Sequence, residues 1–194
     1  MIIRKKFRFE GSHIVRNCSS KRCSMSIHGH SFVVELLIRG NKLDAGGMIV
    51  DFGLLKQYVG QFIDSFDHAT MFWEKDITDY KVDVRKHSDR WIQLPCNVTA
   101  EHLAILFHHV INCILHNTLF MNGESGVTVE GVRIHETETG FEQSEVGDID
   151  NDWARLSKIV FSDGIKAEWK YPNWVEDIKK AKKFINPEVN RQVV

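Results

Sequence analysis

The sequence predicts an α+β protein in which a small antiparallel sheet has two helices on one face. Apolar and polar residues alternate near the N-terminus, and residues 31–40 are rich in β-branched and aromatic side chains. Two later stretches, 52–66 and 99–114, carry apolar residues at helical spacing. A last β-rich stretch follows at 127–137, so strands and helices are largely segregated along the sequence, as in α+β folds.

The first two strands are expected to form a pair. Phe7, Phe9 and His13 occupy alternate positions between polar residues, so they share one face of the first strand. The second strand runs from about residue 28 to Gly40, where a Gly-Asn turn ends it. Met48-Ile49-Val50 is expected to be a further short strand.

The helices have recognisable first residues. Asp51 is expected to cap a helix that runs to Phe66 and delivers Asp67-His68 at its end, and Thr99 is expected to cap the second helix. Residues 70–95 carry many charges and no clean period, so we expect a long excursion with a short helix. Gly131 is a candidate bulge in the last strand.

The composition changes from about Ser144. We therefore divide the protein into a main domain, residues 1–143, and a partly helical C-terminal extension, residues 144–194. One apolar helical face is expected in the extension, ended by Asn186-Pro187, and it consists of Trp174, Ile178, Ala181, Phe184 and Ile185. The lysines around it are expected to be a solvated face: Lys179, Lys180, Lys182 and Lys183.

Length and charge narrow the function classes. The 194 residues are 43% hydrophobic and 26% charged, which is ordinary for a soluble globular protein. A net charge of -1 argues against a general nucleic-acid binder. No signal-peptide core and no apolar run of membrane-spanning length is present, so no membrane association is expected. Four scattered cysteines are too few for a disulfide framework, and a cytoplasmic protein with free thiols is expected.

Three histidines are placed to hold one metal ion. His28 and His30 share a face because side chains alternate along a strand, and His13 lies on the apolar face of the first strand. Three protein ligands with an open fourth position are typical of catalytic zinc. The alternative is a chance His-Gly-His triplet, since the sequence has ten histidines.

Candidate acid–base groups lie near these histidines in the sequence. Cys23 follows Lys21 and Arg22, and positive neighbours favour a reactive thiolate that acts as base or nucleophile. Cys18 is the rival, and a metal site made by the two cysteines themselves is a third interpretation that their spacing suits less well.

Two carboxylates extend this candidate set. Asp67 and His68 are adjacent, so they act together only if the backbone turns there; otherwise Asp67 caps a turn and His68 is a surface residue. Glu136 shares strand phase with Val132 and Ile134, which either buries a carboxylate that needs a partner or leaves it at a solvent-facing edge.

Six short motifs in this order resemble the 6-pyruvoyl-tetrahydropterin synthase and 6-carboxy-5,6,7,8-tetrahydropterin synthase family. They cover roughly residues 1–141 and are Phe9-Glu10-Gly11-Ser12-His13, Cys23 through Phe32, Met48-Ile49-Val50-Asp51-Phe52, Phe66-Asp67-His68, Asn97-Val98-Thr99-Ala100-Glu101 and His135-Glu136-Thr137-Glu138-Thr139-Gly140. The spacing from Cys23 to His28 and the length of the 70–95 excursion depart from the usual pattern.

The resemblance implies a set of roles. His13, His28 and His30 would bind Zn²⁺, and Cys23 would be the proton-abstracting base. Asp67 and His68 would form a relay, while Glu136 would anchor the pterin and join that relay. Thr99 and Glu101 match a motif near the pterin pocket. The resemblance further implies the tunnelling fold, with three subunits closing a barrel and two trimers stacked into a homo-hexamer whose active sites lie between subunits.

The resemblance also implies a reaction. We expect a zinc-dependent lyase that converts 7,8-dihydroneopterin triphosphate to 6-carboxy-5,6,7,8-tetrahydropterin, acetaldehyde and triphosphate, a step of queuosine precursor synthesis. One alternative is 6-pyruvoyl-tetrahydropterin synthesis, which eliminates triphosphate without releasing acetaldehyde. Another is a pterin- or metal-binding protein without turnover, against which the acid–base set argues.

Overall fold

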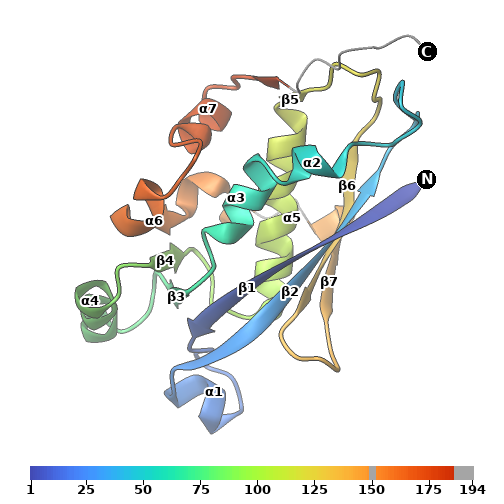
Figure 1. Ribbon diagram of the computed structural model, residues 1–194. Helices are drawn as coiled ribbons and strands as arrows, with labels where there is room; N and C mark the ends of the chain where they lie inside the picture. Colours follow the sequence, from blue (N-terminus) through green and yellow to red (C-terminus); the bar gives the residue numbers. More distant parts are fainter. Residues whose placement is uncertain (149–151, 186–194) are drawn as a thin grey trace.

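A seven-stranded sheet forms the body of the molecule in the computed structural model, which describes residues 1–148 and 152–185 (Figure 1). The strand order is β7-β6-β2-β1-β3-β4-β8. Its antiparallel half consists of β1 (Ile2–His13), β2 (His28–Arg39), β6 (Thr128–His135) and β7 (Glu142–Glu145).

The β1–β2 pair keeps one register along its whole length, from Ile2 opposite Arg39 to His13 opposite His28. Side chains alternate between faces, so Phe9 and Phe32 stack on the core face with ring centroids 4.7 Å apart. The β2–β6 register shifts beside Gly131, where the expected bulge is confirmed.

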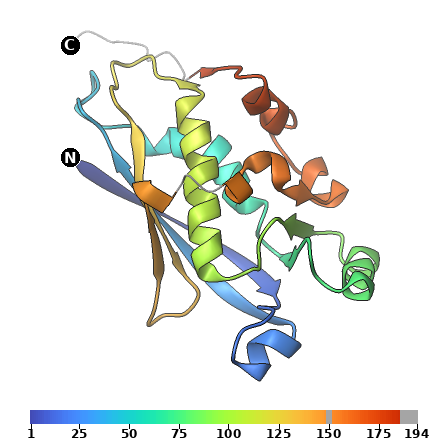
Figure 2. The same cartoon turned by 180° about the vertical axis from the view of Figure 1, so that it is seen from behind.

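Two helical regions cover the face that carries Phe9. The first is α2 (Phe52–Leu55) followed by α3 (Tyr58–Asp64), and the second is α5 (Ala100–His116). Phe66, which follows α3, and Phe107 of α5 both contact the Phe9 ring, at 5.7 and 6.0 Å between centroids. The prediction of two helices on one face is therefore confirmed, and Figure 2 shows α5 crossing the antiparallel strands.

The helix caps are confirmed, but the first helix is not continuous. Asp51 accepts a hydrogen bond from the Gly53 N–H, and Thr99 accepts one from the His102 N–H. Between α2 and α3 the backbone of Gln57 leaves the helical region, with ψ at -105°. This break divides the expected helix 52–66 into two short helices.

The prediction of a strand at residues 48–50 is wrong. Asp44 instead holds the preceding segment as a turn, because its Oδ1 accepts hydrogen bonds from the N–H groups of Gly46 and Met48 at 2.9 and 2.8 Å. Ile49 and Val50 are buried in the core. Their apolar character reflects this burial rather than strand pairing.

The sheet is larger than predicted, and it is mixed rather than antiparallel. The 70–95 excursion supplies β3 (Ala69–Trp73), the expected helix as α4 (Thr78–His87), and β4 (Trp91–Leu94). β3 pairs parallel with β1 at Gly11 and Ser12 only, and β4 pairs parallel with β3. β8 (Val160–Phe161) then adds antiparallel to β4. These strands were missed because each is short and flanked by charged residues.

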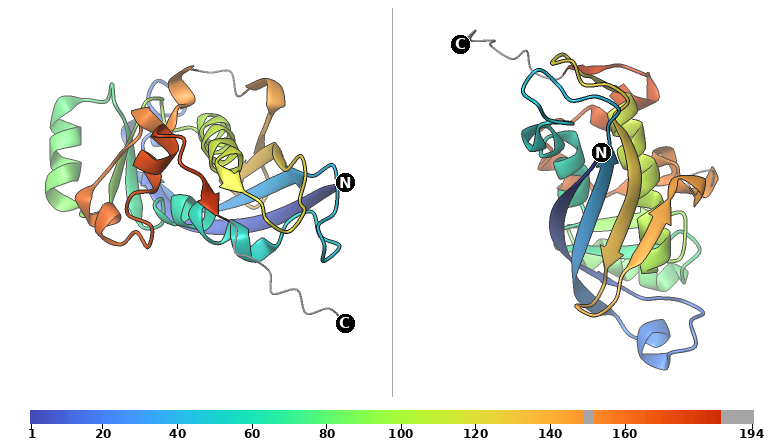
Figure 3. Two further views of the ribbon diagram at one scale, coloured as in Figure 1. Left: turned by 90° about the horizontal axis from the view of Figure 1, so that it is seen from above. Right: turned by 90° about the vertical axis from the view of Figure 1, so that its right-hand side faces the viewer.

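The C-terminal extension packs on the same hydrophobic core. It comprises three short 3-10 turns (Val146–Asp148, Asp152–Ala154, Leu156–Lys158), α6 (Asp163–Ala167), α7 (Trp174–Lys179) and β9 (Phe184–Ile185). Trp174 lies 5.9 Å from Phe62 and Phe184 lies 3.8 Å from Tyr58, both between ring centroids. Figure 3 shows these elements beside α3 and α5.

One element of the extension differs from the prediction. Phe184 and Ile185 were expected to continue a helix, but they form β9, which pairs parallel with β5 (Thr118–Leu119). The helix ends earlier because Ala181 adopts a positive φ of 53°. The four lysines of this region are exposed, as expected. Asn186-Pro187 lies outside the described residues, and among the described helices none is long and apolar enough to cross a membrane.

Candidate active site

The three predicted histidines meet where the β1–β2 hairpin opens. His13 ends β1 directly opposite His28, and His30 lies two residues further along β2 on the same face. One ring nitrogen from each histidine lies within 4.8 Å of the other two. The three imidazoles therefore converge on one point, which is the arrangement that a single metal ion needs.

Backbone carbonyl groups orient two of the three rings. His13 Nδ1 lies 2.8 Å from the Val98 carbonyl oxygen, and His28 Nδ1 lies 3.0 Å from the Ser26 carbonyl oxygen. A carbonyl oxygen only accepts, so each Nδ1 carries the proton and each Nε2 keeps a free lone pair. This is the tautomer in which Nε2 serves as a metal ligand.

Burial favours the neutral form of two of the three histidines. His13 is fully buried, and its burial, reinforced by the nearby His28, lowers its pKa to about 4. Burial also lowers the pKa of His30. The Nε2 atoms of His13 and His30 are buried and make no hydrogen bond within the described residues. Neutral imidazoles with unsatisfied Nε2 atoms fit a zinc ion, because the metal needs the deprotonated nitrogen.

Glu136 lies immediately after β6 and faces this cluster. Its Oε1 is 3.3 Å from His13 Nε2 and 3.6 Å from His30 Nε2, and its side chain is 30% exposed. Burial raises the pKa of Glu136; the charge of His28 opposes this rise, and that of Glu101 adds to it. The half-buried carboxylate therefore borders both the triad and the solvent, where a ligand has access.

The Asn97-Val98-Thr99 segment joins the second helix to the triad. Thr99 Oγ1 caps α5, and Val98 supplies the carbonyl group that orients His13. Glu101, in the first turn of α5, is exposed and is electrostatically coupled to Glu136. The Val98 contact was not predicted, because a backbone carbonyl leaves no signature in a pattern of residue types.

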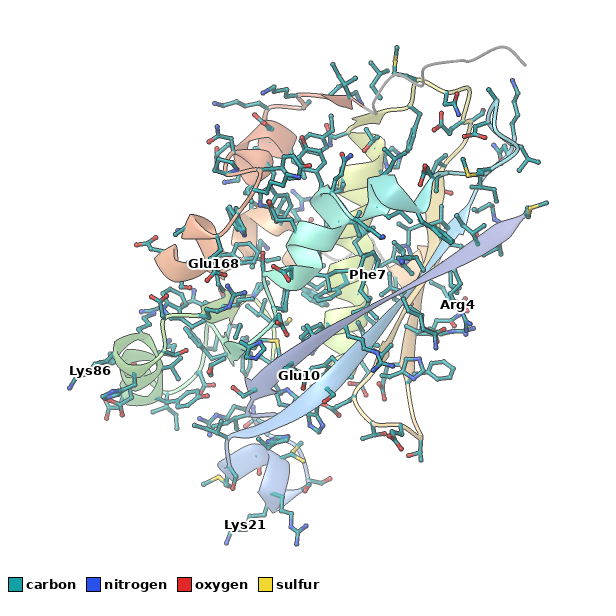
Figure 4. The ribbon with its side chains drawn as sticks, in the orientation of Figure 1. Arg4, Phe7, Glu10, Lys21, Lys86 and Glu168 are labelled. Atoms are coloured by element: carbon teal, nitrogen blue, oxygen red, sulfur yellow. The ribbon has the colours of Figure 1, made fainter. Side chains whose placement is uncertain are left out.

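Cys23 lies on a separate short helix, α1 (Lys21–Met25), in the loop that connects β1 to β2. Its carbonyl oxygen accepts a hydrogen bond of 2.9 Å from the N–H of Val15, two residues after the ligand candidate His13. Cys18 is also half-buried, and its thiol donates to the Ser20 carbonyl oxygen at 3.3 Å. Both cysteines are free thiols. Figure 4 labels Lys21, the first residue of this helix.

Asp67 and His68 lie beside the C-terminal half of β1, where the His68 N–H donates to the Glu10 carbonyl oxygen at 2.6 Å. The backbone turns at His68, where φ is 54°, and the His68 ring nitrogen Nδ1 contacts Asp67 Oδ2 at 2.8 Å. Asp67 Oδ1 accepts a hydrogen bond from the Glu10 N–H at 2.7 Å. Burial alone would raise the pKa of Asp67, but the Glu10 N–H and His68 lower it.

This pair is thus preorganised by the Asp67–His68 contact and by the Glu10 N–H. His68 lines a hollow together with Glu10, Ser12, Ser31 and the triad residue His30. Among the described residues, neither Asp67 nor His68 makes a hydrogen bond or ion pair with the three histidines.

Comparison with known proteins fixes the family. The sequence profile of the 6-pyruvoyl tetrahydropterin synthase family matches residues 2–145. The chain belongs to this family. The resemblance inferred from the motifs is therefore confirmed.

Curated relatives carry a more specific name. A protein of Helicobacter pylori named 6-carboxy-5,6,7,8-tetrahydropterin synthase is 39% identical over 173 residues, which cover 87% of this chain and 86% of the relative. A Rickettsia typhi protein of the same name is 31% identical over 71% of this chain and 94% of its own length. The Helicobacter pylori match extends beyond the residues that the family profile covers.

Solved structures share the fold. An uncharacterized protein from Wolinella succinogenes has a TM-score of 0.61 at 18% identity and covers 75% of this chain and 98% of its own. The Caenorhabditis elegans 6-pyruvoyl tetrahydropterin synthase has a TM-score of 0.52 at 22% identity, covering 75% and 94%. The fold expected from the motifs is thus supported at the level of one subunit.

Proposed function

We propose that the protein is a zinc-dependent lyase that converts 7,8-dihydroneopterin triphosphate to 6-carboxy-5,6,7,8-tetrahydropterin, acetaldehyde and triphosphate. The observation that carries this proposal is the convergence of three histidines beside a half-buried glutamate, in a protein whose 39% identical relative bears the name of this synthase. Membership of the family supports a tetrahydropterin synthase activity, and the name of the curated relatives supports the choice of product.

Zinc would be held by the Nε2 atoms of His13 and His28 and by His30. The donor set supports this choice, since imidazole suits zinc and the fourth position is left for the substrate. A bound zinc ion would make the C–H and O–H protons on the substrate's propyl substituent more acidic. Val98 and Ser26 would keep the His13 and His28 rings oriented during turnover.

The protein's own groups would recognise the pterin and move protons. Glu136 can accept two hydrogen bonds from the amino-pyrimidine edge of the pterin, and its position beside the triad would hold the reacting substituent near the metal. Thr99 and Glu101 would form the neighbouring wall of the pocket. Cys23 would remove the substrate proton as general base, with Cys18 as the rival thiol.

The Asp67–His68 relay would come from a second copy of the protein. His68 lines a hollow together with His30, but within one copy no hydrogen bond or ion pair among the described residues joins it to the triad. Sheet edges support assembly: in the described residues, β1 has no strand partner along its outer edge from Ile2 to Phe9, and β7 pairs only with β6. Pairing of these edges in a trimer would close a barrel and protect them. Two such trimers would form the hexamer.

Product analysis tests the proposed reaction. Purified zinc-loaded protein is incubated with 7,8-dihydroneopterin triphosphate, and acetaldehyde, triphosphate and the pterin product are identified by chromatography and mass spectrometry. Acetaldehyde with 6-carboxytetrahydropterin is expected. Triphosphate with a pyruvoyl-tetrahydropterin and no acetaldehyde would assign the alternative synthase. Saturable pterin binding without any product would indicate a binding protein.

A further inference from the structure

The helix that carries Cys23 has no apolar anchor of its own. None of the residues of α1 is buried, and the hydroxyl group of Ser20, which precedes it, makes no capping hydrogen bond. In the described part of the protein, two hydrogen bonds join this helix to the segment that leaves β1. Val15 N–H donates to the Cys23 carbonyl oxygen at 2.9 Å, and Arg16 Nη1 donates to the Ser24 carbonyl oxygen at 3.2 Å.

Arg16 is itself fixed from the other side. Its Nε donates to Asp76 Oδ1 at 2.8 Å, and its guanidinium lies 5.2 Å from the centroid of the Tyr80 ring. The Arg16 N–H also donates to Asn97 Oδ1 at 3.0 Å. The side chain of Asp76 is 1% exposed and that of Arg16 is 16% exposed. An ion pair so far removed from water is little screened and strongly directional.

The geometry of arginine explains why this residue type stands here. The planar guanidinium holds two acceptors at once in fixed directions, in this case Asp76 Oδ1 and the Ser24 carbonyl oxygen. Asp76 and Tyr80 belong to the segment between β3 and β4. Arg16 thus connects this segment to the helix of Cys23, three residues after His13.

We propose that the Arg16–Asp76 pair positions Cys23 beside the histidine triad. The inference rests on the proposed function, because it takes Cys23 as the base. Neither Arg16 nor Asp76 contacts substrate in this assignment; both act through the position of α1. The segment between β3 and β4 therefore has a task in the reaction although it supplies no catalytic group.

The kinetic test compares Asp76→Ala with Asp79→Ala, an exposed aspartate in the first turn of α4. Asp76→Ala is expected to lower kcat about 10- to 100-fold, because small displacements of a catalytic group have effects of this size. KM and the zinc content are expected to stay unchanged, and Asp79→Ala to behave as wild type. The double variant Arg16→Ala/Asp76→Ala should lose no more than Arg16→Ala alone, since both changes break one unit.

A second measurement is independent of turnover. Hydrogen exchange of the Val15 and Ser24 amides is expected to be faster in Asp76→Ala and unchanged in Asp79→Ala, because both amides are hydrogen-bonded in the loop that Arg16 holds. If Asp76→Ala does not fold, Arg16→Lys replaces it. The single ammonium group of lysine keeps the ion pair with Asp76, but its shorter side chain does not also hold the Ser24 carbonyl oxygen.

These results distinguish a failure of the proposed function from a failure of the positioning role. Wild-type protein without any product contradicts the proposed function, while the exchange data still decide whether Asp76 holds α1. Unchanged exchange in Asp76→Ala overturns the positioning role, whatever its kcat. Faster exchange with an unchanged kcat also overturns it, because the position of α1 would then not matter to the reaction.

Discussion

Polar side chains on the two faces of the β1–β2 hairpin lie in different environments. On the core face, His13 and His30 have buried Nε2 atoms without a hydrogen-bond partner among the described residues. On the open face, the Glu35 side chain is 4% exposed and lies 2.8 to 3.5 Å from Arg4, Lys6, Arg133 and His135. Figure 4 labels Arg4 and Phe7 on opposite sides of β1.

This difference distinguishes the structural cluster around Glu35 from the candidate binding site at the histidines. Buried polar atoms in a finished structure are almost always paired, as those of Glu35 are. The Nε2 atoms of His13 and His30 differ because they converge with His28 on one point, where a single metal ion could bind all three rings. The charges agree: burial leaves His13 neutral and ready to bind a metal, whereas cations keep Glu35 ionised.

Removal of a triad histidine tests the core face most strongly. His28→Ala or His30→Ala is expected to lose zinc and to reduce turnover to background, because two remaining imidazoles bind zinc weakly. Zinc per subunit is measured by elemental analysis beside the product assay. His87→Ala, an exposed histidine of α4, is the control. Full zinc in both triad variants would disprove the site.

The two thiols of the β1–β2 loop provide the next test. Cys23→Ala is expected to lower turnover roughly a hundred- to ten-thousand-fold, the range for a positioned acid–base group, while zinc stays bound. Cys18→Ala should lose little. The reverse pattern would assign the base to Cys18, and similar losses in both variants would contradict a single-base assignment.

Mixed subunits test whether Cys23 of one copy works together with His68 of another. His68→Ala and Cys23→Ala should each be nearly inactive alone. After joint unfolding and refolding of equal amounts, about a quarter of the sites would combine an intact Cys23 with a partner's intact His68 if assembly is random. Turnover near that fraction of wild type is expected. No recovery, in oligomers shown to include both variants, would contradict a shared site.

Much of the core face could be predicted from the sequence, because period-two alternation places His13, His28 and His30 on one side of two strands. The caps Asp51 and Thr99 were predictable for the same reason: the signal is local. The family motifs, not spacing, suggested roles for Asp67 and Glu136, and those roles remain proposals.

The missed features depend on long-range contacts. β3 and β4 are short and pair parallel, so their neighbours are distant in sequence and their own pattern is weak. Arg16 and Asp76 are sixty residues apart and carry no motif. Phe184 was assigned to a helix because its apolar spacing fits, although a positive φ at Ala181 ends that helix.

The smallest expected effect concerns the open face. Burial by itself would raise the pKa of Glu35, but Lys6, Arg4 and His135 lower it overall. A carboxyl group whose pKa is lower in the folded state stabilises the fold above its unfolded pKa, and this contribution is lost as the pH falls through the folded pKa. Glu35→Gln should therefore lower the free energy of unfolding by about 1–3 kcal/mol at pH 7, with zinc content unchanged. The difference from wild type should shrink as the pH falls below about 4, where glutamate is protonated in the unfolded state, and disappear only below the lowered pKa of the folded state. Denaturant unfolding at several pH values measures this.

The control is Glu130→Gln, which removes an exposed ion pair with Arg39 and should change stability little. A pH-independent loss in Glu35→Gln would show that the residue acts through packing, and the contrast between the two faces would then not be electrostatic.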